Sequence, residues 1–205
     1  MKYCEVGFRP FDHRFCLIPM RTVYLEGLKH YPNIEQADRL LCYGYIDHAS
    51  GFTFEVICAT KKVKDGYKFF DSDEENRYFL RAQRIQKEEI EIIENNQLAQ
   101  RYQHKLSVLC QYDVTEDIAW TRTKKVLDNY RDLFFVDDIF VYFAQAGLQV
   151  ECAWIRIEGV KGDTFVGTLL SEPDQAIGIH QSNRVTFIPQ KLEDNSLIFL
   201  YTGRG

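Results

Sequence analysis

The segment from Val150 to the C-terminus constrains the fold most, because it contains regularly spaced short runs rich in β-branched and aromatic residues. The four runs are Cys152–Glu158, Thr164–Leu170, Arg184–Ile188 and Leu197–Thr202. Gly162 and Asp163 provide a tight turn after the first run. Short strands joined by glycine-containing turns are typical of a small barrel or curled sheet. The sequence therefore predicts a C-terminal antiparallel β-module.

The preceding part of the chain mixes strand-like and helix-like patterns. Strands are expected within residues 14–25, 40–60, 77–84 and 104–114. Helices are expected at 86–100, at 116–132 and, over a short stretch, from Asp137 to Gly147. The predicted buried stripe of the helix at 116–132 is Ala119, Val126, Leu127, Tyr130 and Leu133, and Lys124 and Lys125 are expected to point outward.

These patterns predict an α+β fold, with a mixed or antiparallel sheet and two or three helices followed by a small C-terminal antiparallel β-barrel-like module. The sequence Ala146-Gly147-Leu148 interrupts an apolar run and marks the best candidate boundary. We therefore expect an α+β domain at 1–147 and an antiparallel β-module at 148–205.

Charge and hydropathy argue against two classes of partner. The formal net charge is −5, whereas a general nucleic-acid binder needs a basic stripe to displace counterions from phosphates. The densest basic run, Lys61, Lys62 and Lys64, is closed by Asp65 and is interpreted as a solvated hairpin end. No apolar run approaches the ~18 residues that span a bilayer. We expect a cytoplasmic protein without nucleic-acid or membrane partners.

Cysteine and histidine patterns give no support for a metal site or cofactor. The six cysteines form no C-x-x-C pair, and the five histidines lie far apart. Cys42, Cys58, Cys110 and Cys152 each lie in an apolar stretch and are expected to pack in the core. The acidic run 71–76 lacks the glycine and the final glutamate of a calcium-binding loop, which favours a solvated turn. We predict no metal and no cofactor.

Recognisable catalytic motifs are also absent from the sequence. It contains no nucleophile elbow, no phosphate-binding glycine loop and no dinucleotide fingerprint. We therefore assign no catalytic residue. An enzyme built from scattered groups remains an alternative, and its candidates are His48, Cys152, His180 and Asp194.

The strand-like run 152–158 has two distinct faces. One face is apolar and carries Ala153, Ile155 and Ile157. The other carries Cys152, Trp154, Arg156 and Glu158. Because tryptophan and arginine are enriched at binding hot spots, we predict a binding role for Trp154, Arg156 and Glu158. In the alternative interpretation, Trp154 covers the core and the two charged residues are cross-strand partners.

The C-terminal segment resembles a bacterial family of domains of unknown function. The matching residues are Glu151-x-x-Trp154, Gly162-Asp163, Gly167-x-Leu169-x-Ser171-x-Pro173, Val185-x-Phe187 and Asp194, within about 150–203. The family pattern has asparagine at the position of Ser171 and a Gly-Asp turn at 182–183, where this chain has serine and asparagine. The resemblance implies a small β-barrel and an intracellular location, but no reaction.

Together these features predict an intracellular bacterial protein whose function is non-catalytic binding of another protein or a ligand. The alternatives are a small-molecule enzyme without a recognisable motif and a structural homo-oligomer subunit. The sequence leaves the oligomeric state open.

Overall fold

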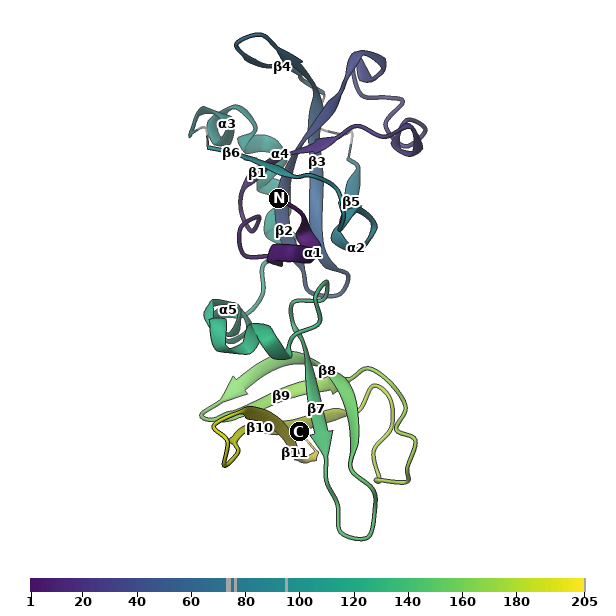
Figure 1. The fold of residues 1–205 in the computed structure, drawn as a ribbon, viewed down its shortest axis with the longest axis vertical. Coiled ribbons are helices and arrows are strands. Elements are labelled where there is room, and N and C mark those ends of the chain that lie inside the picture. Colours follow the sequence, from purple (N-terminus) through teal and green to yellow (C-terminus); the bar gives the residue numbers. More distant parts are fainter. Residues whose placement is uncertain (73–74, 76, 95, 205) are drawn as a thin grey trace. The chain divides into compact units, whose positions relative to one another are not determined.

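The computed structural model describes residues 1–72, 75, 77–94 and 96–204, and the chain forms two compact units, Met1–Asp113 and Val114–Gly205 (Figure 1). One unit is built on an open sheet and the other on a closed barrel, and the described helices are short. This agrees with the predicted α+β class in its coarse form. The boundary predicted at residue 147 lies inside the second unit. The predicted acidic turn at 71–76 lies partly outside the described residues, because 73, 74 and 76 are among those left out.

The first unit contains a six-stranded antiparallel sheet in the order β4-β3-β2-β1-β6, with β5 paired to β3. Its strands are β1 (Phe15–Pro19), β2 (Arg39–Asp47), β3 (Gly51–Val63), β4 (Gly66–Phe70), β5 (Phe79–Arg81) and β6 (Glu91–Ile93). Its helices are α1 (Tyr3–Val6), α2 (Ala82–Ile85), α3 (Asn96–Arg101) and α4 (Gln103–Ser107), with 3₁₀ turns η1 (Thr22–Tyr24), η2 (Ile34–Gln36) and η3 (Val108–Tyr112). The predicted hairpin at 40–60 is confirmed as β2 and β3.

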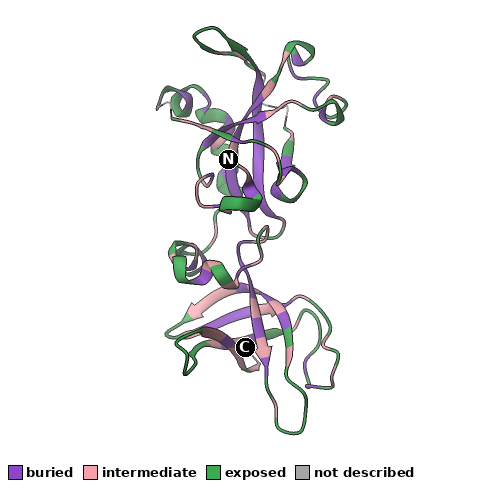
Figure 2. Ribbon diagram, in the orientation of Figure 1, coloured by how far each residue is buried: buried purple, intermediate pink, exposed green. Residues whose placement is uncertain are grey.

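Strand β3 is the centre of this unit, and its first ten residues are buried (Figure 2). On one side, the rings of Tyr3 and Phe54 pack around Phe52, with centroid distances of 5.4 and 5.2 Å. A second cluster joins Ile57 to Tyr102 of the helical segment. The sheet is therefore covered by apolar side chains from segments distant in sequence.

Two predictions in the first unit are wrong, the first of them only in part, because α3 lies at the end of the segment expected to be a helix at 86–100. Part of the segment expected to be a helix at 86–100 forms β6, which pairs with the edge of β1. Just before β6, the Ile90 carbonyl accepts a 2.9 Å hydrogen bond from the Met1 amino group. The expected strand at 104–114 forms α4 and η3 instead. Leu98, Tyr102, Leu106 and Leu109 recur every three or four residues, which is a helical period. The apparent alternation from residue 106 to 112 concealed this longer pattern.

The second unit begins with α5 (Glu116–Thr123) and η4 (Lys125–Tyr130) and continues as a five-stranded closed barrel. The barrel strands are β7 (Asp138–Phe143), β8 (Glu151–Lys161), β9 (Thr164–Leu169), β10 (Arg184–Lys191) and β11 (Leu197–Arg204). Neighbouring strands pair antiparallel, and the barrel closes through a parallel pairing of β11 with β7. The four predicted C-terminal strands are confirmed.

The short helix predicted from Asp137 is wrong, because this segment is β7 and supplies the fifth barrel strand. Ile139, Val141 and Phe143 point into the core, whereas Phe140 and Tyr142 are only half-buried, so the segment alternates with the period of a strand. The barrel consequently begins before the predicted module.

The helix predicted at 116–132 ends at Thr123 and gives way to the 3₁₀ segment η4. Leu127 is buried as predicted, but Ala119, Val126 and Leu133 are exposed. The predicted stripe was wrong because it assumed one continuous helix, whereas the change of helix type at Lys124 turns the later side chains onto different faces.

The barrel core confirms the predicted inward face of β8, since Ile155 and Ile157 are fully buried. Phe165, Phe187 and Phe199 fill the interior with ring centroids 5.3 to 5.9 Å apart. They come from three different strands, so closure of the barrel is what brings these rings together.

Candidate ligand-binding groove

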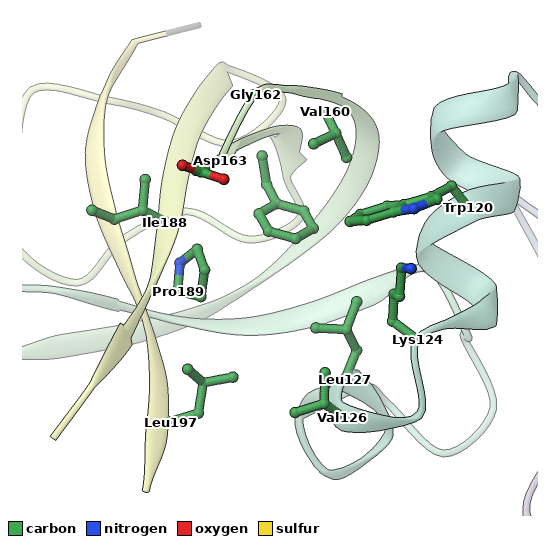
Figure 3. A pocket seen from close by; sticks show the side chains of 11 residues that line it. Trp120, Lys124, Val126, Leu127, Val160, Gly162, Asp163, Ile188, Pro189 and Leu197 are labelled. Carbon is green, nitrogen blue, oxygen red and sulfur yellow. The ribbon is translucent and has the colours of Figure 1, made fainter. Parts of the chain in front are cut away.

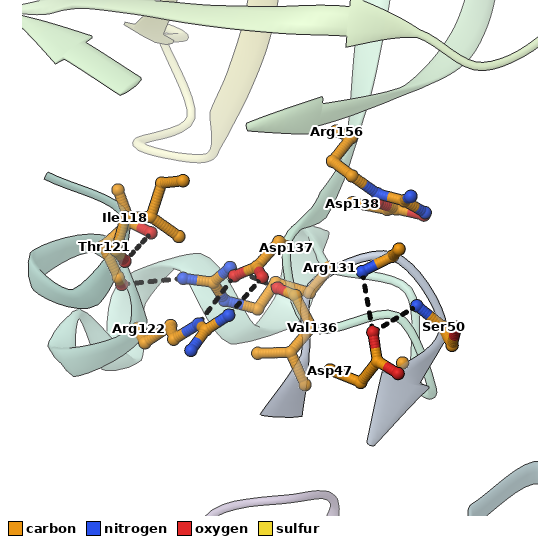
Figure 4. Close-up of polar contacts among 12 residues, drawn as sticks. Asp47, Ser50, Ile118, Thr121, Arg122, Arg131, Val136, Asp137, Asp138 and Arg156 are labelled. Atoms are coloured by element: carbon orange, nitrogen blue, oxygen red, sulfur yellow. Dashed lines mark hydrogen bonds and ion pairs between the residues drawn. The ribbon is translucent and has the colours of Figure 1, made fainter. Parts of the chain in front are cut away.

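Two arginine side chains join the helical segment of the second unit to the start of the barrel (Figure 4). Arg122 in α5 donates from Nε and Nη2 to the two carboxylate oxygens of Asp137, at 3.0 and 2.6 Å. Arg131 donates from Nη2 to the Thr121 carbonyl at 2.7 Å and from Nη1 to the Val136 carbonyl. These bonds fix the end of α5 against the residues that enter β7.

Further contacts hold α5 and η4 against the barrel itself. Asp117 Oδ2 lies 3.5 Å from the backbone nitrogen of Val160 in β8. The side chain of Leu127 belongs to the barrel core, and the Tyr130 ring meets Phe199 edge to face at 5.4 Å. The Tyr130 hydroxyl accepts a hydrogen bond from the Leu197 backbone nitrogen at 3.3 Å. The helical segment thus covers one end of the barrel.

A cavity of about 610 Å³ lies between this helical segment and the barrel (Figure 3). Its helical wall is formed by Trp120, Lys124, Val126 and Leu127. Its barrel wall is formed by Val160, Gly162, Asp163, Phe165, Ile188, Pro189 and Leu197. We call this cavity, as defined by these residues, the α5–barrel groove. Its volume falls in the range of small-molecule sites, about 300–1,000 Å³.

Large apolar side chains are exposed at this groove. Trp120 is 47% exposed and Val126 is 62% exposed, although both line a concave surface. Lone exposed hydrophobic residues are common, but a cluster of them in a hollow indicates a binding surface. Covering these two side chains would remove apolar area from water, which provides a driving force for binding an apolar molecule.

The groove contains two charged side chains on opposite walls. Lys124 is half-buried and its Nζ lies 4.3 Å from the centroid of the Trp120 ring, a cation–π contact. Asp163 is exposed on the turn between β8 and β9. Within the described part of the chain, neither side chain has an ion-pair partner. The groove therefore combines an apolar body with a few polar groups, as ligand sites typically do.

The residues predicted to bind, Trp154, Arg156 and Glu158, lie half-buried on the outside of β8. The Trp154 ring packs edge to face on Phe140 of β7, with centroids 5.1 Å apart. Glu158 Oε1 accepts a hydrogen bond of 3.2 Å from a β9 threonine hydroxyl. All three thus contact neighbouring strands, as the cross-strand interpretation expects. Their binding role stays a prediction.

Arg156 is engaged in a two-point interaction with Asp138, its direct neighbour on β7. The Nε and Nη2 atoms donate to Oδ1 and Oδ2 at 2.8 and 3.0 Å. Burial raises the pKa of Asp138 above its usual value, although the hydrogen bonds from Arg156 act in the opposite direction. A partner that recruited this guanidinium would have to disrupt a buried ion pair.

Two of the four residues proposed for the enzyme alternative, His180 and Asp194, have separate local partners. His180 Nδ1 lies 2.6 Å from Glu172 Oε1, and Asp194 Oδ1 accepts a hydrogen bond of 2.6 Å from the Ser196 hydroxyl. His48 belongs to the first unit. The described residues contain no cluster of three histidine, cysteine, aspartate or glutamate side chains suited to a metal ion.

Burial of the cysteines agrees with the sequence only in part. Cys42 and Cys58 are buried as predicted, and burial raises the pKa of the Cys58 thiol to about 11. The prediction for Cys110 and Cys152 is wrong, because both side chains are exposed. Cys110 lies in a 3₁₀ turn rather than a strand, and Cys152 lies on the outward face of β8.

Sequence reasoning missed Trp120 and treated Lys124 only as a solvated charge. The available signal was their spacing of four residues, which places an aromatic ring and a cation next to each other on a helix. The barrel wall had no comparable signal, because Phe165 and Leu197 are distant in sequence and are brought together by the barrel.

Comparisons with protein-family models, curated proteins and solved structures give no match to this chain. Among the residues that the structure describes, no helix combines the length and apolar character needed to cross a membrane. The predicted resemblance of the C-terminal segment to a bacterial family accordingly stays a prediction.

Proposed function

We propose that the second unit is a non-catalytic ligand-binding module and that its site is the α5–barrel groove. The observation that carries this proposal is the coincidence of a cavity of about 610 Å³ with exposed Trp120 and Val126 on its wall. Ligand sites are mostly apolar hollows with few polar groups, and this groove has that character.

The rigidity of the walls supports the same function. The Arg122–Asp137 pair and the insertion of Leu127 into the barrel core join the helical wall to the barrel through contacts of the protein itself. A site that exists before binding costs less conformational entropy to occupy, so a small molecule can bind with useful affinity. An apolar ligand of about 17 heavy atoms at about 0.3–0.4 kcal/mol per atom would bind with a Kd of roughly tens to hundreds of micromolar.

The proposal is tested with the neutral fluorescent dye N-phenyl-1-naphthylamine. Val126→Asp places a charge in the groove at an already exposed position, so it should abolish dye binding without unfolding the protein. Val150→Asp is the matched control, because Val150 is 63% exposed and does not line the groove. Dye fluorescence should rise on titration with the wild type and the control, but not with Val126→Asp.

Energy transfer from a tryptophan to the bound dye can also show which tryptophan lies beside the dye. The chain has only two tryptophans, Trp120 and Trp154, and only Trp120 lines the groove. In a Trp154→Phe variant, bound dye should quench the remaining tryptophan emission. Failure of the dye to bind, or equal loss of binding in both valine variants, would contradict the groove as the site.

A further inference from the structure

The helical wall of the α5–barrel groove offers hydrogen-bond donors without matching acceptors. The Lys124 ammonium lies over the Trp120 ring, and Figure 3 shows its nitrogen and the indole nitrogen on the same side of the groove. Within the described residues, no carboxylate pairs with Lys124 and no acceptor engages the indole N–H. Both groups can only donate hydrogen bonds, so this wall is complementary to an anion.

The position of Lys124 favours an anion that is part of an apolar molecule. Its cation–π contact with Trp120, at 4.3 Å, holds the ammonium beside the apolar lining. Its partial burial reduces screening by water, which strengthens attraction to a negative group placed there. A free inorganic ion would gain this attraction but would leave the apolar walls wet.

The other charged group of the groove does not cancel this preference. Asp163 follows Gly162 on the opposite wall of the groove, and it is exposed to water (Figure 3). Water screens an exposed carboxylate more effectively than it screens the half-buried ammonium. A ligand anion beside Lys124 is therefore attracted more strongly by the ammonium than it is repelled by the Asp163 carboxylate.

We propose that the α5–barrel groove selects small apolar molecules that carry one anionic group, and that Lys124 is the residue that binds this anion. The inference rests on the proposed function, since it names the ligand class of the same site. An aromatic or alicyclic carboxylate, sulfonate or phosphate fits this description, with its apolar body against Phe165 and Val126.

Two dyes with the same apolar body separate this inference from the proposed function. The probe 1-anilinonaphthalene-8-sulfonate carries a sulfonate, whereas N-phenyl-1-naphthylamine has no charge. The wild-type protein should bind the anionic dye about tenfold more tightly, which corresponds to one charge-assisted hydrogen bond. The advantage should shrink as salt is added, because salt screens the attraction.

Variants of Lys124 and of its neighbour Lys125 test whether Lys124 causes the preference for the anionic dye. Lys124→Met should lose about tenfold in affinity for the anionic dye and keep its affinity for the neutral dye, and Lys124→Arg should restore the preference. Lys125→Met is the matched control, since Lys125 is exposed and lies outside the groove lining, and it should change neither affinity. Unchanged urea midpoints for the variants would show that they are folded.

Failure of the anion preference and failure of the proposed function would give different results. If the neutral dye binds in the groove but the anionic dye has no advantage, or Lys124→Met weakens both equally, the anion preference is wrong and the proposed function stands. If neither dye binds, the proposed function fails and this inference fails with it. A dimer in light scattering that Val126→Asp dissociates would also overturn both, because a second copy would then occupy the groove.

Discussion

The buried pair between Arg122 and Asp137 provides the sharpest test of how the second unit is held together. The Asp137 side chain is 1% exposed and that of Arg122 is 15% exposed, and two hydrogen bonds of 3.0 and 2.6 Å join them. Removing one member of such a pair leaves a buried charge without compensation, at a cost of about 3–5 kcal/mol. We expect the lower end, about 3 kcal/mol, for Asp137→Ala, because water can reach part of Arg122.

Arg122→Met removes the two-point partner of the more deeply buried Asp137 carboxylate, so it should cost at least as much as Asp137→Ala. The double variant Arg122→Met/Asp137→Ala removes both charges, and its loss should be smaller than the sum of the single losses by about 2–3 kcal/mol. Both tryptophans lie in the second unit, so their fluorescence during urea unfolding reports on this unit alone. With a denaturant slope of about 1.5 kcal/mol per M, each single variant should lower the midpoint by about 2 M.

A surface pair of the same unit provides the control for this cycle. The His180–Glu172 pair has side chains that are 73% and 55% exposed, and His180→Ala should leave the urea midpoint unchanged within error. Additive losses in the Arg122–Asp137 cycle, or a loss below about 1 kcal/mol for Arg122→Met, would refute the view that this pair fixes the helical wall.

Two further predictions concern glycine packing and thiol access. Gly167→Ala should destabilise the barrel by about 1–3 kcal/mol or more, because its Cβ would lie 2.4 Å from the Arg156 carbonyl oxygen. Gly159→Ala should cost less in the same urea assay, because its Cβ would have no contact closer than 3.7 Å. Equal losses for the two variants would contradict the close approach at Gly167. Ellman's reagent should react quickly with three of the six thiols in the native protein and with the other three only after unfolding. The fast group is Cys4, Cys110 and Cys152, and the protected group is Cys16, Cys42 and Cys58. Four or more fast thiols would show that a buried position opens readily.

The tests of the groove complement these measurements. The valine pair at positions 126 and 150 asks whether an apolar molecule binds there, and the lysine pair at 124 and 125 asks what charge that molecule carries. The Arg122–Asp137 cycle then asks whether the helical wall is held without a ligand. The variant Asp137→Ala connects the three questions, because loosening the helical wall should weaken the binding of both dyes.

The local alternation of residues determined much of the barrel. Between Ala153 and Ile157 every second side chain is apolar, and that pattern is satisfied only by a strand with one face in a core. In β8 this pattern succeeds because a strand with a single buried face imposes its period of two directly on the sequence. Alternation also predicted the hairpin of β2 and β3, although both faces of β3 are buried over its first ten residues.

Tertiary contacts determined the secondary structure of the segments whose local sequence patterns were ambiguous. The segment at 91–93 became a strand because the edge of β1 offers backbone hydrogen bonds, which outweigh its weak helical pattern. The segment at 103–112 became helical because its apolar residues reach the sheet with a period of three to four. The pairing of 91–93 depends on a distant strand, so intrinsic propensity could not predict it. The helical period from Leu98 to Leu109 was present in the sequence, but the alternation from residue 106 to 112 competed with it.

The groove was decided almost wholly by tertiary structure. The sequence contained the Trp120–Lys124 spacing, but a tryptophan and a lysine one turn apart do not define a site until a wall faces them. Closure of the barrel brings Phe165 and Leu197 to that position, and the long-range Arg122–Asp137 pair fixes the helix opposite them. The sequence by itself therefore determined the strands of the barrel, whereas the cavity arises from contacts between residues far apart in the chain, which no local pattern encodes.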